Sequence, residues 1–228
     1  SLSVWAGPVL YEYAFNINGV VSNITLGDSL PSTVDVTDFN DVSGLGTISI
    51  TISSVGDHAV LSYFDHEVDE TTNTWYNETG AANGSPAAGQ SWEIDEPGFG
   101  SDKNGSANSQ YFGDIYANFE DNLLDNLAFY DSIYDQTLTP PDDVALAMGW
   151  DFNLLTDQTA VIAFVVSETA PSSGFYLSQT DAGTQYSLYL SSSLTIRGGG
   201  GPQVAQPAIV LRMGVGLAGL GYARKGRH

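Results

Sequence analysis

The sequence contains no cysteine and very few basic residues. The lack of cysteine excludes disulfide bonds, thiolate metal ligands and thiol catalysis. Lysine and arginine number 6 against 27 Asp and Glu, and Lys103 is the one basic residue before Arg197. One basic residue against 27 acids gives residues 1–196 a formal charge of −26, whereas residues 197–228 hold five basic residues and no acids. A nucleic-acid partner is excluded, because a phosphate-binding surface needs clustered Lys and Arg.

Several catalytic patterns are missing as well. The chain has no G-x-S-x-G nucleophile elbow, no G-x-x-x-x-G-K-[ST] phosphate loop and no EF-hand spacing. The stretch "HEVDE" (His66–Glu70) lacks the second histidine of the H-E-x-x-H zinc motif. No strand–helix–strand rhythm of about 30 residues occurs, so a doubly wound nucleotide-binding fold is not expected. These absences favour a non-enzymatic protein.

Apolar residues instead alternate with polar ones at a period of two, which is typical of half-buried strands. Many short strands separated by turns predict an all-β domain, a β-sandwich of jelly-roll-like type. The first three form a predicted meander, with a turn at Gly56–Asp57. The predicted strands cover residues 11–17, 45–55, 58–68, 91–95, 143–154, 159–168, 173–180 and 185–196.

Two regions break this rhythm. Apolar residues at three- and four-residue steps predict one short amphipathic helix, roughly Gly113–Leu127. Residues 77–110 are rich in Gly, Asn, Ser and Ala, which predicts long surface loops around the strand "SWEID".

The charge and composition boundaries predict four segments. Residues 1–7 form either a signal-peptide remnant or a first strand, and residues 8–197 form the β-sandwich domain. Residues 198–206 form a flexible, glycine-rich linker. Residues 207–228 form a hydrophobic helix with a basic end.

A calcium site is one hypothesis for the acidic stretch "FDHEVDE". Asp65, Glu67 and Asp69 alternate along it, so in a strand their carboxylates share one face. Like charges so placed repel one another unless a cation bridges them or solvent separates them. Carboxylate oxygens are the ligands that calcium prefers, so Ca²⁺ is the predicted cofactor if there is one. The alternative is a solvated strand end.

The stretch "SWEIDEPGFG" resembles the E-I-D-x-E strand of jelly-roll endoglucanases and laminarinases, which are retaining glycoside hydrolases. Glu93 and Asp95 share a face, but Pro97 stands where that pattern has its second Glu, and Glu96 points to the other face. A retaining site needs two carboxyl groups roughly 5–5.5 Å apart, so a second carboxylate near Glu93 would revive hydrolysis. Sugar binding without hydrolysis is the broader hypothesis, and its candidate residues are Trp75, Trp92, Glu93 and Asp95.

The end of the chain resembles the PEP-CTERM sorting signal of exported proteins of Gram-negative bacteria. That signal has a V-P-E-P-like motif, an apolar helix ending in a pattern like G-L-A-G-L-G-x-x-R, and a basic end. Here Ala205 and Gln206 stand in place of the Pro and Glu of the motif, so the motif is degenerate. The residues that carry the resemblance are Val204, Ala205, Gln206 and Pro207 in the motif, and Arg224, Lys225 and Arg227 in the basic end.

The apolar segment 208–223 corresponds to about 24 Å of helix, which is shorter than a bilayer core of about 30 Å. Arg212 lies within it, and a charged residue inside a span is costly. A transient anchor in the inner membrane, later removed by a sorting and processing membrane protease, is therefore expected rather than a permanent one.

Together these features predict an exported, acidic, non-enzymatic protein of the cell surface or extracellular matrix. Exopolysaccharide binding and self-association are its predicted interactions. Three alternatives stand beside this prediction: a carbohydrate- or calcium-binding module, a degenerate jelly-roll glycosidase, and a fibre subunit. In the fibre subunit the N-terminal strand "VLYEYAFNI" would pair with the sheet edge of a neighbouring copy.

Overall fold

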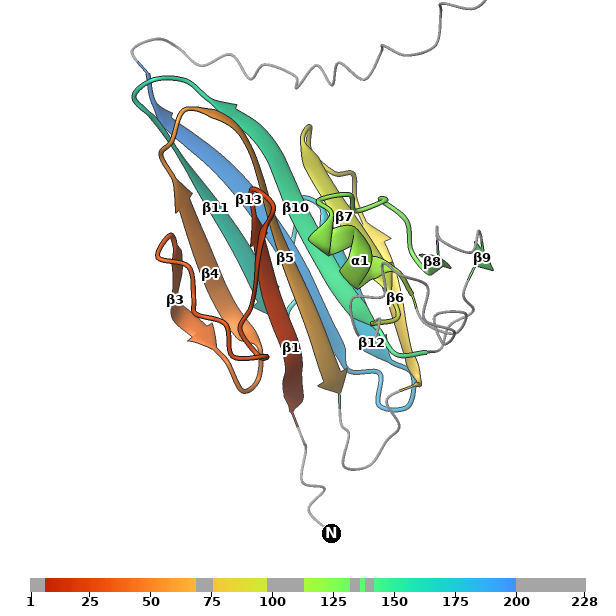
Figure 1. The fold of residues 1–228 in the computed structure, drawn as a ribbon. Coiled ribbons are helices and arrows are strands. Elements are labelled where there is room, and N and C mark those ends of the chain that lie inside the picture. The colour runs from red at the N-terminus through yellow and green to blue at the C-terminus, as the bar shows by residue number, and fades with distance from the viewer. Residues whose placement is uncertain (1–6, 69–75, 98–112, 132–135, 138–141, 200–228) are drawn as a thin grey trace, which may run out of the picture.

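Two antiparallel sheets packed face to face make up most of the computed structural model (Figure 1). It describes residues 7–68, 76–97, 113–131, 136–137 and 142–199. The first sheet has the strand order β2-β1-β5-β10-β7, and the second has the order β3-β4-β11-β13-β12-β6. The predicted all-β sandwich with one short helix is confirmed at this level.

The bounds of the first sheet are β1 (Pro8–Ile17), β2 (Val20–Asn23), β5 (Gly56–Val68), β7 (Gln90–Asp95) and β10 (Ala145–Leu154). Those of the second are β3 (Val34–Asn40), β4 (Leu45–Ile52), β6 (Glu78–Asn83), β11 (Gln158–Ser167), β12 (Tyr176–Asp181) and β13 (Ser187–Gly198). A small separate pair consists of β8 (Tyr130–Asp131) and β9 (Gln136–Thr137), and the helix is α1 (Ile115–Glu120).

The main hydrophobic core lies between the two sheets. Period-two alternation puts alternate residues of a strand there, and β11 shows the pattern most regularly: from Ala160 onward each inward residue is buried and each outward residue is part-exposed. Burial of this apolar surface is the main stabilising contribution to the sandwich. The largest fully buried side chains facing this core are Phe15, Ile48, Ile50, Phe64, Ile94, Leu146, Met148, Leu154 and Phe164.

A second, smaller core covers the outer face of the first sheet. Helix α1 lies against β5, β7 and β10, as Figure 1 shows, and inserts Ile115 and Phe119. The small residues Ala145 and Ala147 on β10 leave room for the helix. Tyr63 of β5 packs edge-on against the ring of Tyr116 and at a tilt against that of Phe119. Strand β5 is therefore buried on both faces.

The helix is shorter than its apolar periodicity predicts. It ends at Glu120, and Asn122 follows with a φ of 55°, a left-handed conformation that interrupts a helix. Leu123 and Leu127, predicted to lie on the buried face of a longer helix, are 51% and 44% exposed. The prediction of a helix over 113–127 was wrong in its second half.

The order of the first strands also differs from the predicted meander. Strands β4 and β5 are consecutive in sequence but lie in different sheets, and β1 pairs with β5 instead. The turn between them falls at residues 53–55, so Gly56 begins β5 and is not part of the turn. The chain crosses between the two sheets at this point.

Residues 78–83, predicted as loop, form the edge strand β6. Its composition is rich in small residues because the backbone there lies close to the core: a Cβ on Gly80 would lie 2.3 Å from Ile94 Cγ2. Strand β1, proposed from the sequence as a donated fibre strand, is paired with β5 from Pro8 to Ile17 and with β2 over residues 14–17. Pairing of this strand with a neighbouring copy stays a prediction.

The predicted N-terminal remnant 1–7, apart from Gly7, lies outside the described residues. So do Asp69, Trp75 and the whole predicted sorting segment from 200 to 228, including Val204, Ala205, Gln206, Pro207, Arg224, Lys225 and Arg227. Among the residues that are described, no helix combines the length and apolar character that a membrane span requires.

Candidate cation site under helix α1

Acidic side chains gather on the outer face of the first sheet, beside and beneath α1. Strand pairing sets Glu12, Asp65, Ala145 and Asp95 in one row across β1, β5, β10 and β7. Glu93 and Glu67 lie on the same face because each is two residues from a member of that row. The sheet thus brings together acids that are far apart in the sequence.

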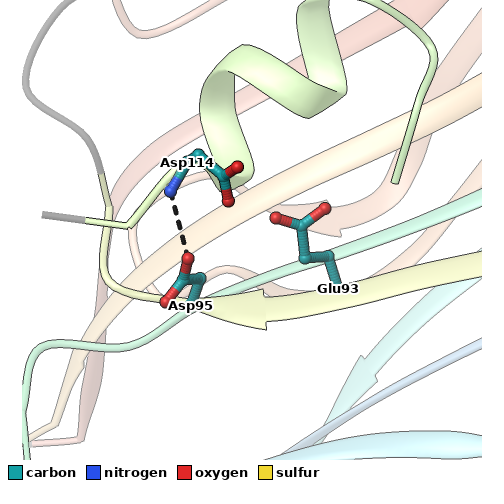
Figure 2. Close-up of side chains that lie close together, drawn as sticks. All are labelled: Glu93, Asp95 and Asp114. Carbon is teal, nitrogen blue, oxygen red and sulfur yellow. Dashed lines mark hydrogen bonds between the residues drawn. The ribbon is translucent and has the colours of Figure 1, made fainter. Parts of the chain in front are cut away.

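Three of these carboxylates form a compact group, which we call the triad: Glu93, Asp95 and Asp114. One carboxylate oxygen from each lies within 4.8 Å of the other two. Glu93 and Asp95 come from β7, and Asp114 precedes the first residue of α1; Figure 2 shows the three groups facing the same space. The exposed fractions of the three residues are 1%, 0% and 3%, so water is largely excluded from them.

Backbone and amide donors fix the triad in place. The Asp114 N–H donates to Asp95 Oδ2 at 3.0 Å, and the Glu96 N–H donates to Asp95 Oδ1 at 3.0 Å. Asn118 Nδ2 donates to Glu93 Oε1 at 3.0 Å, and the Asp125 N–H donates to Glu93 Oε2 at 3.1 Å. The carboxylates of β7 therefore attach the α1 segment to the sheet.

A glycine allows the approach of that segment. A Cβ on Gly113 would lie 2.2 Å from Asp95 Cγ and 2.3 Å from its Oδ2, which is far inside van der Waals contact. Any side chain at this position would displace the carboxylate or the chain before α1. Gly113 is thus part of the geometry of the triad.

Electrostatics work against three ionised carboxylates here. Burial raises the pKa of Asp95 to about 8, with a further rise from Asp114, and the two N–H donors oppose it. Burial also raises the pKa of Glu93 well above its usual range, and the nearby charge of Asp125 raises it further. In the described part of the chain Arg197 is the one lysine or arginine, and it is exposed on β13 of the other sheet. No basic side chain there compensates the triad.

The two histidines of the described part do not supply the missing charge. Burial lowers the pKa of His66 to about 4, so the ring is neutral at pH 7. His58 lies at the other end of β5, where its ring contacts Ser54 O and Asn18 Oδ1. Among the described residues the triad has no basic counter-charge, which leaves protons or a bound cation to neutralise it.

The geometry of the triad suits calcium. Calcium takes 6–8 oxygen ligands at about 2.3–2.6 Å, so two oxygens on one ion are at most about 5 Å apart. The oxygens of the triad meet that condition. Zinc is disfavoured, because its sites use mainly nitrogen and sulfur ligands.

The calcium prediction made from Asp65, Glu67 and Asp69 is changed in part by the structure. Asp65 and Glu67 share a face as predicted, but they are 5% and 7% exposed, which is not the solvated strand end of the alternative hypothesis. They also lie beside the triad and are not members of it. Sequence reasoning missed Asp114, since its approach to β7 depends on how α1 packs on the sheet.

The predicted sugar-binding residues do not share one surface. Trp92 faces the core between the sheets, where its ring lies 5.8 Å from that of Phe175, whereas Glu93 and Asp95 face the opposite way. Glu93 does have carboxylates within the separation that a retaining glycosidase requires. All three groups are buried beneath α1, however, so the described structure gives a sugar ring no access to them.

The fold and the site together define a class: an antiparallel β-sandwich with a buried carboxylate cluster under a covering helix. Comparison with known proteins adds no relative to this description. No protein-family model, no curated protein and no solved structure matches the chain.

Proposed function

We propose that this chain is a non-enzymatic, exported protein of the cell surface or extracellular matrix that binds a calcium ion through the triad. The observation that carries the calcium part is the convergence of three buried carboxylate oxygens within 4.8 Å, with no basic side chain of the described residues beside them. Calcium completes the fold by attaching α1 to the sheet more firmly than the hydrogen bonds alone.

The energetic case rests on what replaces water around the triad. A buried ionised carboxylate costs several kcal/mol unless a counter-charge and hydrogen bonds compensate it. At neutral pH without a cation, the triad must take up protons or repel the α1 segment. A divalent cation removes both costs, so ion binding and packing of α1 support each other.

Calcium is favoured over magnesium for the same site. Magnesium requires near-ideal octahedral geometry at about 2.0–2.1 Å and keeps several of its waters. Oxygens spaced up to 4.8 Å apart in a closed, largely dry place fit the longer and more variable calcium bonds better.

Export is supported by sequence features. An acidic domain followed by a glycine linker, an apolar segment and a basic end matches the order of a sorted exported protein. Extracellular fluids also hold far more free calcium than cytoplasm, which suits a site of moderate affinity. A sorting protease and exopolysaccharide are the proposed partners, and jelly-roll connectivity is the proposed finer description of the sandwich.

The calcium proposal is tested by calorimetric titration and thermal unfolding of the full chain after chelation, at pH 7.5. We expect binding heat and a rise in Tm with Ca²⁺, and a weaker response to Mg²⁺. Gly113→Ala is expected to remove the part of both responses that comes from the triad, because its Cβ would occupy the position of the Asp95 carboxylate. Gly7→Ala is the matched control, since its Cβ meets nothing within 4 Å. Absence of both heat and stabilisation in the unmodified chain would refute the proposal.

Export is tested separately, by fractionating Gram-negative bacterial cells that express the gene and by mass spectrometry of the mature protein. We expect the protein outside the inner membrane and a new C-terminus near Pro207. An intact cytoplasmic chain would reject export and leave the calcium proposal standing.

A further inference from the structure

We infer that Asp65 and Asp143 form a second divalent-cation site, on the same sheet face as the triad and separate from it. The inference uses other ligands than the triad, and it is carried by polar atoms that are buried without hydrogen bonds.

Strand register places the two residues together. Asp65 of β5 is paired with Ala145 of β10, and Asp143 lies two residues before Ala145. Val144, between Asp143 and β10, is fully buried in the main core, and Asp143 is the charged group that acts most strongly on the pKa of Asp65. Asp143 therefore lies close to Asp65, while Ala145 stands between Asp65 and Asp95 in the strand register.

The pair differs in its hydrogen bonding from the two β7 members of the triad. Every carboxylate oxygen of Glu93 and Asp95 accepts an N–H donor. By contrast, Asp65 Oδ1 and Asp143 Oδ1 receive no hydrogen bond from any described residue, although the residues are only 5% and 4% exposed. Native proteins rarely leave such atoms unsatisfied, and an ion is one of the standard reasons when they do.

A third unsatisfied atom lies beside them. Tyr63 Oη, on the same strand face as Asp65, is fully buried and has no hydrogen-bond partner in the described part of the chain. Burial raises the pKa of Tyr63 well above its usual range, and among the charged groups Asp65 adds most to the rise. A phenol held neutral in this way is suited to donate a hydrogen bond to a water bound by the ion.

The surrounding charges are all of one sign. The groups that raise the pKa of Asp65, after burial, are Asp143, Glu67 and Glu12, in that order. Burial raises the pKa of Asp143 to about 7, and Asp142 adds to it. A cation between Asp65 and Asp143 would satisfy their open oxygens and neutralise this part of the face.

Two carboxylates offer fewer ligands than three, and the rest must come from water, backbone or Glu67. We therefore expect the pair to bind more weakly than the triad, and to prefer calcium for its tolerance of irregular coordination. Asp65 is held by the central strand β5, and Asp143 lies two residues before the adjacent strand β10.

The test is the calcium stoichiometry of the full chain, measured by calorimetry at pH 7.5 after chelation. We expect two ions for the unmodified chain, one for Asp65→Asn or Asp143→Asn, and one for Asp95→Asn. The exposed Asp157→Asn is the matched control and should keep two. Circular dichroism confirms the fold of each variant, and the two substitutions in the pair must agree.

Terbium luminescence supplies a second readout that depends on Tyr63. A Tb³⁺ ion at the pair lies close to this ring, so excitation of tyrosine should sensitise its emission. Tyr63→Phe should lower the emission while two ions still bind, and Asp65→Asn should remove that component.

The possible outcomes separate the two proposals. If the unmodified chain binds one ion and Asp95→Asn binds none, the second site is overturned and the triad is supported. If Asp65→Asn and Asp143→Asn both still bind two ions, the second ion binds elsewhere, and the proposed second site is again overturned. One ion that is lost only in Asp65→Asn and Asp143→Asn supports the pair and refutes the triad. No binding at all refutes both.

Discussion

In the absence of calcium, the substitution Asp95→Asn is expected to destabilise the chain at low pH and to stabilise it at high pH. Asp95 is fully buried, and its pKa rises from 3.8 to about 8 on folding. Between those values the folded state holds a proton that the unfolded state releases, so stability falls as pH rises. The slope is about 1.4 kcal/mol per pH unit, or on the order of 5 kcal/mol by pH 8.

Asparagine removes that pH-dependent cost but loses one hydrogen-bond acceptor. Asp95 accepts from two N–H groups, and an amide oxygen serves only one of them well, which leaves a buried donor at a cost of about 1–3 kcal/mol. At pH 4.5 the variant should therefore be less stable than the unmodified chain. At pH 8.5 it should be more stable, by roughly 2–4 kcal/mol.

The assay is urea unfolding of both proteins in chelator across pH 4.5–8.5, with Asp157→Asn as a control whose effect should not vary with pH. In saturating calcium the order at pH 8.5 should reverse. An ion at the triad at 1,000 times its Kd stabilises the unmodified chain by about 4.1 kcal/mol, which exceeds the advantage of the variant, and an ion at the second proposed site would stabilise both proteins alike. A stability difference between Asp95→Asn and the unmodified chain that is constant over this pH range would refute the reasoning.

Four further substitutions, one of them a control, test the packing of the fold around the site. Phe119→Ala should destabilise the chain by about 3–5 kcal/mol in urea unfolding, because its buried ring fills the smaller core, whereas Leu123→Ala, half exposed beyond the end of α1, should cost less than about 0.5 kcal/mol. Gly80→Ala should cost about 1–3 kcal/mol by the same measurement, since its Cβ would collide with Ile94, and a neutral result would contradict the close approach. Asn16→Ala should increase hydrogen exchange in residues 113–125, because its amide donates to two carbonyls at the end of α1; unchanged exchange would show that it does not hold the helix.

Much of the sandwich was predictable from local pattern. Strand β11 alternates cleanly from Ala160 onward and β10 alternates in its second half, and their predicted bounds lie within a few residues of the observed ones. Strand β6 was not predictable, because its small residues show no alternation of apolar and polar side chains. Gly80 is required there by close packing against Ile94. The overlong helix has a similar cause: Asn122 ends it in a left-handed conformation that apolar spacing does not show.

The candidate site was predictable only where it lies on one strand. Glu93 with Asp95, and Asp65 with Glu67, share faces because of strand periodicity, and the sequence shows that. Asp114 lies near Glu93 and Asp95 because α1 packs on the sheet, and Asp143 lies near Asp65 because β10 is the neighbour of β5. Both depend on the tertiary structure, which the sequence pattern does not show. Burial was also beyond the sequence, since a run of acids is usually solvated.

Strand β5 joins the hydrophobic core and the acidic face in a single register. Phe64 and Val68 point into the core, while Asp65 and Glu67 point the other way. A shift of the pairing by one residue would put carboxylates into the core and phenylalanine under the helix. A mutation that moves this strand would therefore disrupt folding as well as the acidic face, and the proposed ligand Asp65 is held by the same register as the core. A cation bound as proposed would meet a carboxylate already held in place, so little of its binding energy would be spent on ordering the strand.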